Sequence, residues 1–393
     1  MAEFPFVHGL GKKYNQDLKV IFVSADWLDE EKQVKAKTYE NEKRKIGIVG
    51  SLLSLVFILL FYFSGLSDYL ANINLSFIYV FLIYVTIFHV LSTIIGLPLG
   101  YYSSYVHEHK WGFSNYTNKT WLLDQLKSFA VSLILLPILL GLFFWVLWKF
   151  PDTWWLVAAT VTTLVSIVFV TLFPVVILPI FNKYDPIEDE MLTNQLSDIL
   201  HKAGLKPSGF FRQDMSRQTK KENAFLAGMG KTRRVVIADN LLENMSLSEI
   251  KSVIAHEVGH YHFSHLPKNI LIGTIQQLII FYLLNIIMKI LYPEFLTSNT
   301  NNLSLFPMFS LIMSLLSTLL FGPLNNMISR YFERQADRTS LELYPDKDSF
   351  QKAMAGLANR NLSNAYPEWW VKLLYYSHPP IGERLSFAEN YKL

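Results

Sequence analysis

The sequence has no cysteine and few charged residues, and both deficits narrow what the protein can be. Without cysteine the chain has no disulfides and no thiolate ligands for a metal ion. Only 17% of its residues are charged, against about 25% in a typical soluble protein. The formal net charge is only +3, and we expect no nucleic-acid partner.

Hydrophobic residues make up 51% of the chain and aromatic residues 15%. A helix needs about 20 apolar residues to cross the core of a bilayer. One such stretch could be a buried core helix, but six together exclude a soluble fold. The predicted spans are residues 46–65, 75–97, 129–147, 154–173, 270–290 and 306–328. We therefore predict an integral, multi-pass membrane protein in contact with the lipid bilayer.

Lysine and arginine are distributed unevenly among the segments that join the predicted spans, and this bias sets orientation. Residues 67–74 and 293–302 have neither, whereas residues 101–127 and 329–338 have three each. We expect both termini and the long segment 182–268 to face the cytoplasm. The first span begins only at Ile46, after a polar segment, so we expect no cleavable signal peptide.

Residues 256–260 read His-Glu-Val-Gly-His, an H-E-x-x-H pattern inside the stretch 246–265, which we expect to be helical. Residues four apart lie one above the other on a helix, so His256 and His260 can direct ring nitrogens at one metal ion. Glu257 is then placed to reach a water on that metal rather than the metal itself. The pattern is typical of zinc hydrolases.

A catalytic zinc ion takes three protein ligands and keeps a fourth position for water. Two predicted spans separate His260 from the acidic segment with Glu333 and Asp337, so this segment returns to the same side of the membrane. Glu333 could be the third ligand, and Asp337, one turn later, could hold a ligand histidine through its outer N–H. Alternatively, Glu333 is a surface acid near Arg330 and Arg334.

His262 and His265 also follow the motif, but the longer metzincin pattern needs glycine three residues and histidine six residues after the second histidine. Phe263 and Leu266 occupy those positions. We expect His262 and His265 to be helix-face residues near the membrane surface rather than ligands.

The segment between the fourth and fifth spans has the pattern of a small α+β domain. Apolar residues recur at helical spacing over residues 191–203. Residues 234–238 are a β-branched run typical of a strand. Ser246 and Glu249, three apart, form a capping box that predicts the start of the motif helix.

The run Asn223, Ala224 and Phe225 precedes this strand and has two interpretations. It is either an ordinary strand with an Asx-type bend or an edge strand beside the metal site. An edge strand can bind a substrate as an additional strand, main chain to main chain.

Several ordered motifs accompany H-E-V-G-H. After the two-span hairpin come Phe332-Glu333 and Ala336-Asp337, and then Ser377-His378-Pro379-Pro380 and Glu383-Arg384. Upstream lie Glu108-His109-Lys110-Trp111-Gly112-Phe113-Ser114, Pro179-Ile180-Phe181-Asn182-Lys183-Tyr184 and Asn223-Ala224-Phe225. With these motifs nearly the whole chain resembles the type I CAAX prenyl protease family. These are integral-membrane zinc metalloproteases related to the HtpX-like heat-shock proteases.

The resemblance implies roles for individual residues. It places the zinc ligands at His256, His260 and Glu333, and the general base at Glu257. It places a substrate-pairing edge at Asn223, Ala224 and Phe225, and support of the transition state at His378 and Arg384. Without the resemblance, His378 before two prolines would be interpreted as a turn residue and Arg384 as a surface charge.

We therefore predict a mainly α fold: a polytopic helical membrane protein with about six spans and a small α+β cytosolic zinc-metalloprotease domain. Its predicted segments are 1–45 (cytosolic), 46–181 (four spans with loops), 182–268 (metalloprotease domain), 269–328 (transmembrane hairpin) and 329–393 (the rest of the domain). Eukaryotic members of the family begin with a further span, and we expect six spans here where they have seven. We therefore expect a prokaryotic cytoplasmic membrane rather than the endoplasmic reticulum.

The resemblance implies one zinc ion per chain and a peptide or protein substrate, prenylated or not. Such an enzyme would remove the C-terminal tripeptide of prenylated proteins at the cytosolic membrane face. A broad-specificity quality-control protease for membrane proteins would use the same chemistry, and a transporter or scaffold with an inactive motif is a third hypothesis.

Four polar residues lie within the predicted spans and have two interpretations. They are His89, Gln276, Gln277 and Asn285. Members of the family enclose a water-filled chamber between their spans, which these side chains could line. Alternatively, they form hydrogen bonds between helices in a packed bundle.

Overall fold

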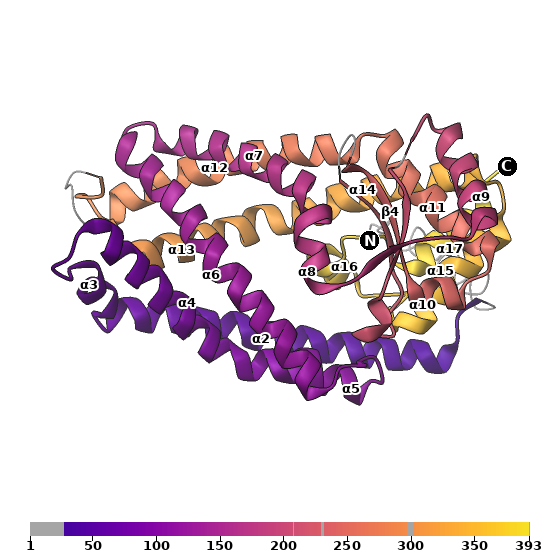
Figure 1. Ribbon diagram of the computed structural model, residues 1–393, viewed down its shortest axis with the longest axis horizontal. Helices are drawn as coiled ribbons and strands as arrows, with labels where there is room; N and C mark the ends of the chain where they lie inside the picture. The colour runs from indigo at the N-terminus through magenta and orange to yellow at the C-terminus, as the bar shows by residue number, and fades with distance from the viewer. Residues whose placement is uncertain (1–26, 207, 229–231, 297–301, 393) are drawn as a thin grey trace, which may run out of the picture.

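The structure is a computed structural model that describes residues 27–206, 208–228, 232–296 and 302–392. Long helices extend along the molecule, and a small sheet with shorter helices lies at one end (Figure 1). The C-terminal end of the chain lies beside these shorter helices (Figure 1). Of the predicted segment 1–45, residues 1–26 lie outside the described residues.

Among the described residues, six helices are long and apolar enough to cross a membrane, which confirms the predicted number of spans. They are α2 (Glu30–Phe63), Phe77–Lys110, α6 (Asn118–Lys149), Trp154–Phe181, α12 (His265–Leu291) and Phe306–Leu343. The helices extend beyond the apolar runs because helical hydrogen bonding continues into the flanking polar residues. Helix α2, for example, begins at Glu30 rather than Ile46, where Asp29 accepts a hydrogen bond from the Lys32 N–H at 3.0 Å.

Three of these helices contain a turn of π-helix. The helix Phe77–Lys110 consists of α4 (Phe77–Tyr101), η2 (Tyr102–His107) and α5 (Glu108–Lys110). The helix Trp154–Phe181 consists of α7 (Trp154–Leu172), η3 (Phe173–Ile177) and α8 (Leu178–Phe181). The helix Phe306–Leu343 consists of α13 (Phe306–Leu316), η6 (Ser317–Phe321) and α14 (Gly322–Leu343). A short helix, α3 (Leu66–Ala71), lies between α2 and α4. Because a π turn interrupts the regular helical repeat, it changes the direction of the side chains that follow it.

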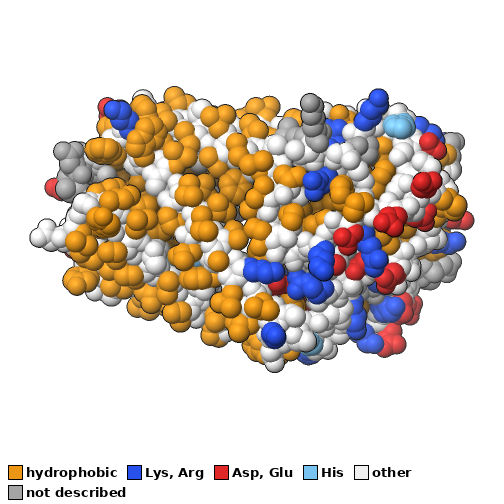
Figure 2. All heavy atoms as spheres, in the orientation of Figure 1, with side chains coloured by type: hydrophobic (Ala, Val, Ile, Leu, Met, Phe, Trp, Pro, Cys, Tyr) orange, Lys and Arg blue, Asp and Glu red, His pale blue; other side chains and the backbone are white. Residues whose placement is uncertain are grey.

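The long helices have an apolar exterior as well as an apolar interior. Trp154 and Tyr84 are fully buried between them, whereas Leu60 and Trp148 are 63% and 72% exposed. Hydrophobic side chains cover this part of the molecule, and charged side chains gather over the end with the sheet (Figure 2). An apolar surface of this extent matches the hydrocarbon core of a bilayer. The chain is therefore an integral, multi-pass membrane protein.

Polar side chains in the spans are hydrogen-bonded to neighbouring helices. The contacts are His89 Nε2 with Ser132 Oγ (2.8 Å), Gln276 Nε2 with Asn325 Oδ1 (2.7 Å), Thr162 Oγ1 with Gln277 Oε1 (2.7 Å), and Trp154 Nε1 with Asn285 Oδ1 (2.9 Å). Of the two interpretations of these residues, the contacts favour hydrogen bonding between helices.

The sheet has four strands in the order β1-β2-β4-β3. The strands are β1 (Tyr184–Pro186), β2 (Phe210–Gln213), β3 (Ala224–Ala227) and β4 (Arg234–Ala238). Strand β4 coincides with the predicted strand 234–238, because its β-branched side chains are buried in the domain core. It pairs in parallel with β2 and antiparallel with β3, with Phe225 opposite Val236.

Short helices surround this sheet and share one core with it. They are α9 (Glu190–Lys202), η4 (Met215–Arg217), α10 (Asp239–Asn244), α11 (Leu247–His262), α15 (Lys347–Asn361), α16 (Trp369–Tyr375) and α17 (Ile381–Asn390). The core includes Val235 and Ile254 from before the last two spans, and Phe350 and Leu385 from after them. The extramembrane domain is therefore assembled from two segments that a membrane hairpin separates.

Candidate metal centre

Helix α11 carries the H-E-x-x-H residues and packs against α14. The predicted capping box closes its first turn: Ser246 N donates to Glu249 Oε2 at 2.7 Å, and Glu249 N donates to Ser246 Oγ at 3.4 Å. The predicted helix 246–265 ends earlier, at His262. Ser264 follows with a φ of +55°, a left-handed conformation that interrupts the helix before α12 begins.

His256, His260 and Glu333 converge on one point. The Nε2 atoms of the two histidines are 3.3 Å apart. Glu333 Oε2 lies 3.2 Å from His256 Nε2, and Glu333 Oε1 lies 3.3 Å from His260 Nε2. One ligand atom from each residue lies within 4.8 Å of the others. Helix α14 thus brings Glu333 beside the motif helix after the two-span excursion.

The donor atoms of this cluster fit a metal ion. Two imidazoles and one carboxylate are a common ligand set for catalytic zinc. Glu333 Oε2 is buried and has no hydrogen-bond partner among the described residues, a deficit that a cation would remove. His260 is 29% exposed at its side chain, whereas those of His256 and Glu333 are 8% and 6% exposed. The cluster therefore has one accessible side, as a catalytic site needs.

Asp337 and Arg384 lie on the outer side of His256. Asp337 Oδ1 is 2.9 Å from His256 Nδ1. Arg384 donates to the Asp337 carboxylate through Nη2 at 2.5 Å and through Nε at 3.0 Å. Arg384 is only 7% exposed, so it is part of a buried ion pair and not a surface charge.

Burial and hydrogen bonding shift the protonation of the motif residues. Burial disfavours the charged form of His256, but Asp337 and the nearby carboxylate of Glu333 raise the pKa of His256 to about 9. A metal ion must therefore displace a proton from His256 at neutral pH. Burial also raises the pKa of Glu257 above its ordinary value. This shift suits a carboxylate that must both accept and release a proton.

His378 approaches the cluster from the accessible side. It lies on the loop between α16 and α17, and its Nε2 is 3.3 Å from Glu333 Oε1. Its Nδ1 is 3.0 Å from Ser377 Oγ, and its side chain is 61% exposed. His378 can therefore contact a substrate directly. Arg384 contacts the outer side of His256 instead, with 3.3 Å between Nη2 and Nδ1.

Strand β3 is an edge of the sheet and packs beside α11. Within the described residues it pairs only with β4. Asn223 is exposed just before the strand, Ala224 is buried, and Phe225 is partly buried. The backbone N–H of Leu226 lies close to the Glu257 carboxylate. An extended peptide beside β3 would therefore lie next to Glu257.

The motif loop Glu108-Ser114 contacts the segment that leads into β3. Lys221 Nζ donates to Glu108 Oε2 at 2.7 Å and to the Tyr39 hydroxyl at 2.5 Å. Ser114 forms an antiparallel bridge with Thr219. These contacts connect the start of β3 to α2 and to the end of the second span.

Two residues that shape the site were not predicted. His265 was expected to be a helix-face residue near the membrane surface rather than a ligand. It lies on α12 and outside the metal cluster, but it is buried at 2% exposure, with Nδ1 3.0 Å from His260 Nδ1. The left-handed turn at Ser264 directs it toward α11, and nothing in the sequence marks that turn. Gly259 lies where α11 meets α14, and the glycine inside the motif was the available signal. His262 is exposed, as expected.

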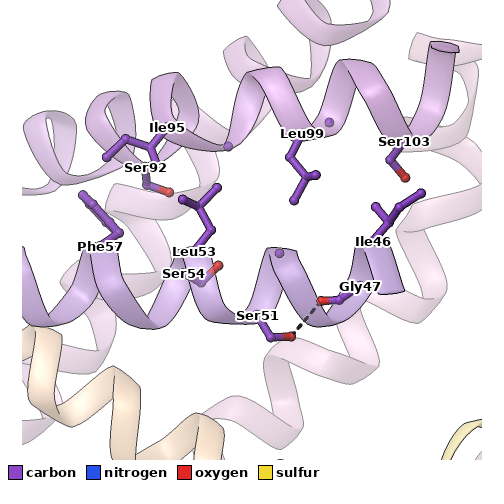
Figure 3. A pocket seen from close by; sticks show the side chains of 13 residues that line it. Ile46, Gly47, Ser51, Leu53, Ser54, Phe57, Ser92, Ile95, Leu99 and Ser103 are labelled. Carbon is purple, nitrogen blue, oxygen red and sulfur yellow. Dashed lines mark hydrogen bonds between the residues drawn. The ribbon is translucent and has the colours of Figure 1, made fainter. Parts of the chain in front are cut away.

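A pocket of about 470 Å³ opens elsewhere, between α2 and the helix formed by α4 and η2 (Figure 3). Glycine, serine and aliphatic residues line it, including Gly50, Ser54, Gly96 and Leu99. Residues of the metal cluster do not line this pocket.

The fold and the cluster are those of a membrane-embedded metallopeptidase. A family model described as Peptidase family M48 matches residues 186–392, and one described as CAAX prenyl protease N-terminal, five membrane helices, matches residues 15–183. The described part of residues 15–183 contains four candidate spans. The chain belongs to peptidase family M48.

Similar proteins extend over most of the chain. CAAX prenyl protease 1 of Saccharomyces cerevisiae is 28% identical over 98% of this chain and 92% of its own length. Uncharacterized metalloprotease YhfN of Bacillus subtilis is 28% identical over 78% of this chain and 72% of its own length. The crystal structure of S. mikatae Ste24p matches with a TM-score of 0.80 and 27% identity, over 91% of this chain and 89% of that chain.

Proposed function

We propose that this protein is a zinc metalloendopeptidase in which His256, His260 and Glu333 hold one zinc ion. The observation that carries the proposal is the convergence of donor atoms from α11 and α14 within 4.8 Å. Two imidazoles and a carboxylate leave a fourth position for water, as catalytic zinc requires. Glu333 Oε2 supports the same assignment, because it is buried without a hydrogen-bond partner among the described residues.

Glu257 is the proposed general base. Zinc, when bound, lowers the pKa of a coordinated water to about 7 and polarises the substrate carbonyl. The Glu257 carboxylate accepts the proton of the attacking water and passes it to the leaving amine. Its raised pKa favours the first of these transfers.

His378, Asp337 and Arg384 have distinct proposed roles. His378 lies on the accessible side and donates to the carbonyl oxygen as negative charge develops there. Asp337 holds the outer nitrogen of His256, and Arg384 fixes the Asp337 carboxylate. Arg384 thus supports the reaction through Asp337 rather than by contact with the substrate.

The edge of β3 is the proposed peptide-binding element. Asn223, Ala224 and Phe225 lie where an added strand would bring its main chain beside Glu257. Main-chain pairing fixes the direction of a peptide with little dependence on its side chains. The same edge therefore suits substrates of varied sequence.

We place the site on the cytosolic face of a membrane, which in a prokaryote is the cytoplasmic membrane. The lysine and arginine residues between the spans support this orientation. The proposed substrate class is a prenylated protein with a C-terminal CAAX sequence, by similarity to relatives named CAAX prenyl proteases. The reaction removes the C-terminal tripeptide.

In the test, the purified protein is incubated with two peptides that share one sequence and end in a CAAX tetrapeptide. One peptide is farnesylated and the other is not. We expect release of the tripeptide, faster from the farnesylated peptide, and at least about 100-fold slower with a Glu257→Gln variant. An unfolded membrane protein is a third substrate. If it is cut at many sites while both peptides stay intact, the protein is a quality-control protease and the proposed substrate class is wrong.

A further inference from the structure

The two motif histidines have different partners on their outer nitrogens. His256 Nδ1 contacts the Asp337 carboxylate at 2.9 Å. His260 Nδ1 contacts another histidine, with 3.0 Å to His265 Nδ1. The far nitrogen of that ring, His265 Nε2, is 3.0 Å from Gln335 Oε1. A chain of hydrogen bonds therefore leads from His260 through His265 to α14.

The surroundings of His265 keep its ring fixed. The residue is 2% exposed. Its ring stacks on Phe332 with a centroid distance of 4.2 Å and an interplanar angle of 13°. Phe263 stacks at 5.8 Å and 12°. The left-handed Ser264 places His265, the first residue of α12, in this position.

Metal binding at His260 Nε2 would determine the direction of each hydrogen bond between His260, His265 and Gln335. His260 Nε2 faces Glu333 and His256, so a metal would bind this nitrogen and the ring proton must be on Nδ1. That N–H donates to His265 Nδ1, which must then be unprotonated. His265 carries its own proton on Nε2 and donates it to Gln335 Oε1. Each contact thus has one donor and one acceptor.

We propose that His265 and Gln335 are positioning residues that hold His260 in the tautomer and orientation needed to bind the metal. This inference rests on the proposed role of His260 as a ligand. The partner of His260 is an imidazole, whereas that of His256 is a carboxylate, so the two ligands differ in basicity. We call the hydrogen-bonded series His260, His265 and Gln335 the relay. Because His265 begins α12, the relay also connects a membrane span to the metal cluster.

Gln335, the last residue of the relay, is itself hydrogen-bonded to Tyr331. Its Nε2 donates to the Tyr331 hydroxyl at 3.3 Å, which leaves Oε1 to accept from His265. Helix α14 therefore supplies three of the groups around the cluster: Glu333 in contact with both histidines, Asp337 behind His256, and Gln335 behind His265.

The test compares two substitutions of His265, one that removes its hydrogen-bond acceptor and one that removes its ring. His265→Phe keeps a ring that can stack on Phe332 but removes the acceptor, whereas His265→Asn removes the ring but keeps an acceptor near the position of Nδ1. Zinc affinity is measured on the purified full-length protein by competition with a chelator. We expect His265→Phe to weaken zinc binding by about 10- to 100-fold, and His265→Asn to recover most of that affinity.

The exposed histidine three residues earlier supplies the matched control. His262→Phe should bind zinc as the wild type does, and thermal unfolding checks that every variant is folded. Wild-type affinity in His265→Phe, or an equal loss in His265→Asn, would overturn the relay and leave only a packing role. A His260→Ala variant that retains zinc would instead contradict the ligand assignment, so the two failures are distinguishable.

A second pair of variants tests the far end of the relay. Gln335→Leu removes the acceptor for His265 Nε2, and we expect it to weaken zinc binding in the same direction as His265→Phe. Gln335→Glu supplies a charged acceptor and should bind zinc at least as tightly as the wild type. Equal affinities for Gln335→Leu and Gln335→Glu would overturn the assignment of Gln335.

Discussion

Glu257 and Gly259 are adjacent to metal-binding positions, but each acts in a different way. Glu257 lies beside the backbone N–H of Leu226 and has a raised pKa because it is buried. Gly259 allows the backbones of α11 and α14 to approach closely, since a Cβ at this position would lie 2.7 Å from Ala336 Cα. Gly259 therefore serves packing, whereas the proposed role of Glu257 is catalytic.

Replacing Glu257 by glutamine should separate catalysis from metal binding. The amide occupies the same volume but cannot accept the proton of water, so we expect kcat to fall by about 100- to 10,000-fold. Zinc content should stay at the wild-type level because Glu257 is not a proposed ligand. Peptide cleavage and metal content are measured on the same preparation, and full activity in Glu257→Gln would exclude it as the base.

Replacing Gly259 by alanine should disturb the contact between α11 and α14. The new Cβ would also meet the Ala336 carbonyl oxygen and Thr339 Cβ at 3.1 Å each. Overpacking of this kind costs about 1–3 kcal/mol, and separation of the helices would move Glu333 away from the histidines. We expect a lower unfolding midpoint and weaker zinc binding.

Gly273→Ala is the matched control, because nothing lies within 4 Å of the Cβ that it adds in α12. It should leave both the unfolding midpoint and zinc affinity unchanged. A Gly259→Ala protein that matches it in both measurements would contradict the importance of this close approach.

Among the elements, α2 does more than cross the membrane, because its polar N-terminal part holds the loop that carries His378. Glu40 Oε2 accepts a hydrogen bond from the Tyr376 hydroxyl at 2.6 Å, and its Oε1 accepts from the Asn364 N–H at 3.0 Å. Arg330 of α14 donates to the Tyr376 carbonyl at 2.5 Å. The start of the His378 loop is thus fixed from two sides.

Replacing Tyr376 by phenylalanine should loosen this loop without affecting the metal. A hydrogen bond to a charged group contributes about 1.5–3 kcal/mol. We expect kcat to fall by about tenfold, or about 1.4 kcal/mol in the barrier, while zinc affinity stays constant. Tyr375→Phe, at the exposed neighbouring position, is the control. An unchanged kcat in Tyr376→Phe would show that α2 does not position His378.

Among the helices and strands, sequence patterns predict best those elements that have a local signal, such as a run of buried apolar residues or a capping box. Residues 234–238 and the start of the motif helix at Ser246 were predicted correctly, since a β-branched run and a capping box are local signals. The turn at Ser264 was not, because a left-handed serine is stabilised only by tertiary contacts. The position of His265 depends on that turn.

On the scale of the whole molecule, two segments separated by a membrane hairpin form one domain. The number of spans could be predicted because a bilayer fixes the length of each apolar run. The even number of spans between His260 and Glu333 then brought both to one side of the membrane. Distances within the cluster could not be predicted, because they depend on how closely α11 and α14 pack.

The orientation of the molecule can be tested with introduced cysteines, since the natural sequence has none. Lys202 is exposed at the end of α9, and Asp152 is exposed in the turn between α6 and α7. We expect Asp152→Cys to react with a membrane-impermeant maleimide in intact cells, and Lys202→Cys to react only after permeabilisation. Labelling of Lys202→Cys in intact cells would reverse the proposed orientation.

Metal content is the most direct test of a zinc site divided between α11 and α14. Zinc is measured by mass spectrometry on purified wild-type protein and on the Glu333→Ala and Glu257→Gln variants. We predict one zinc ion per chain in the wild type and in Glu257→Gln, and little zinc in Glu333→Ala. Zinc at the wild-type level in Glu333→Ala would contradict the proposal that α14 completes the site.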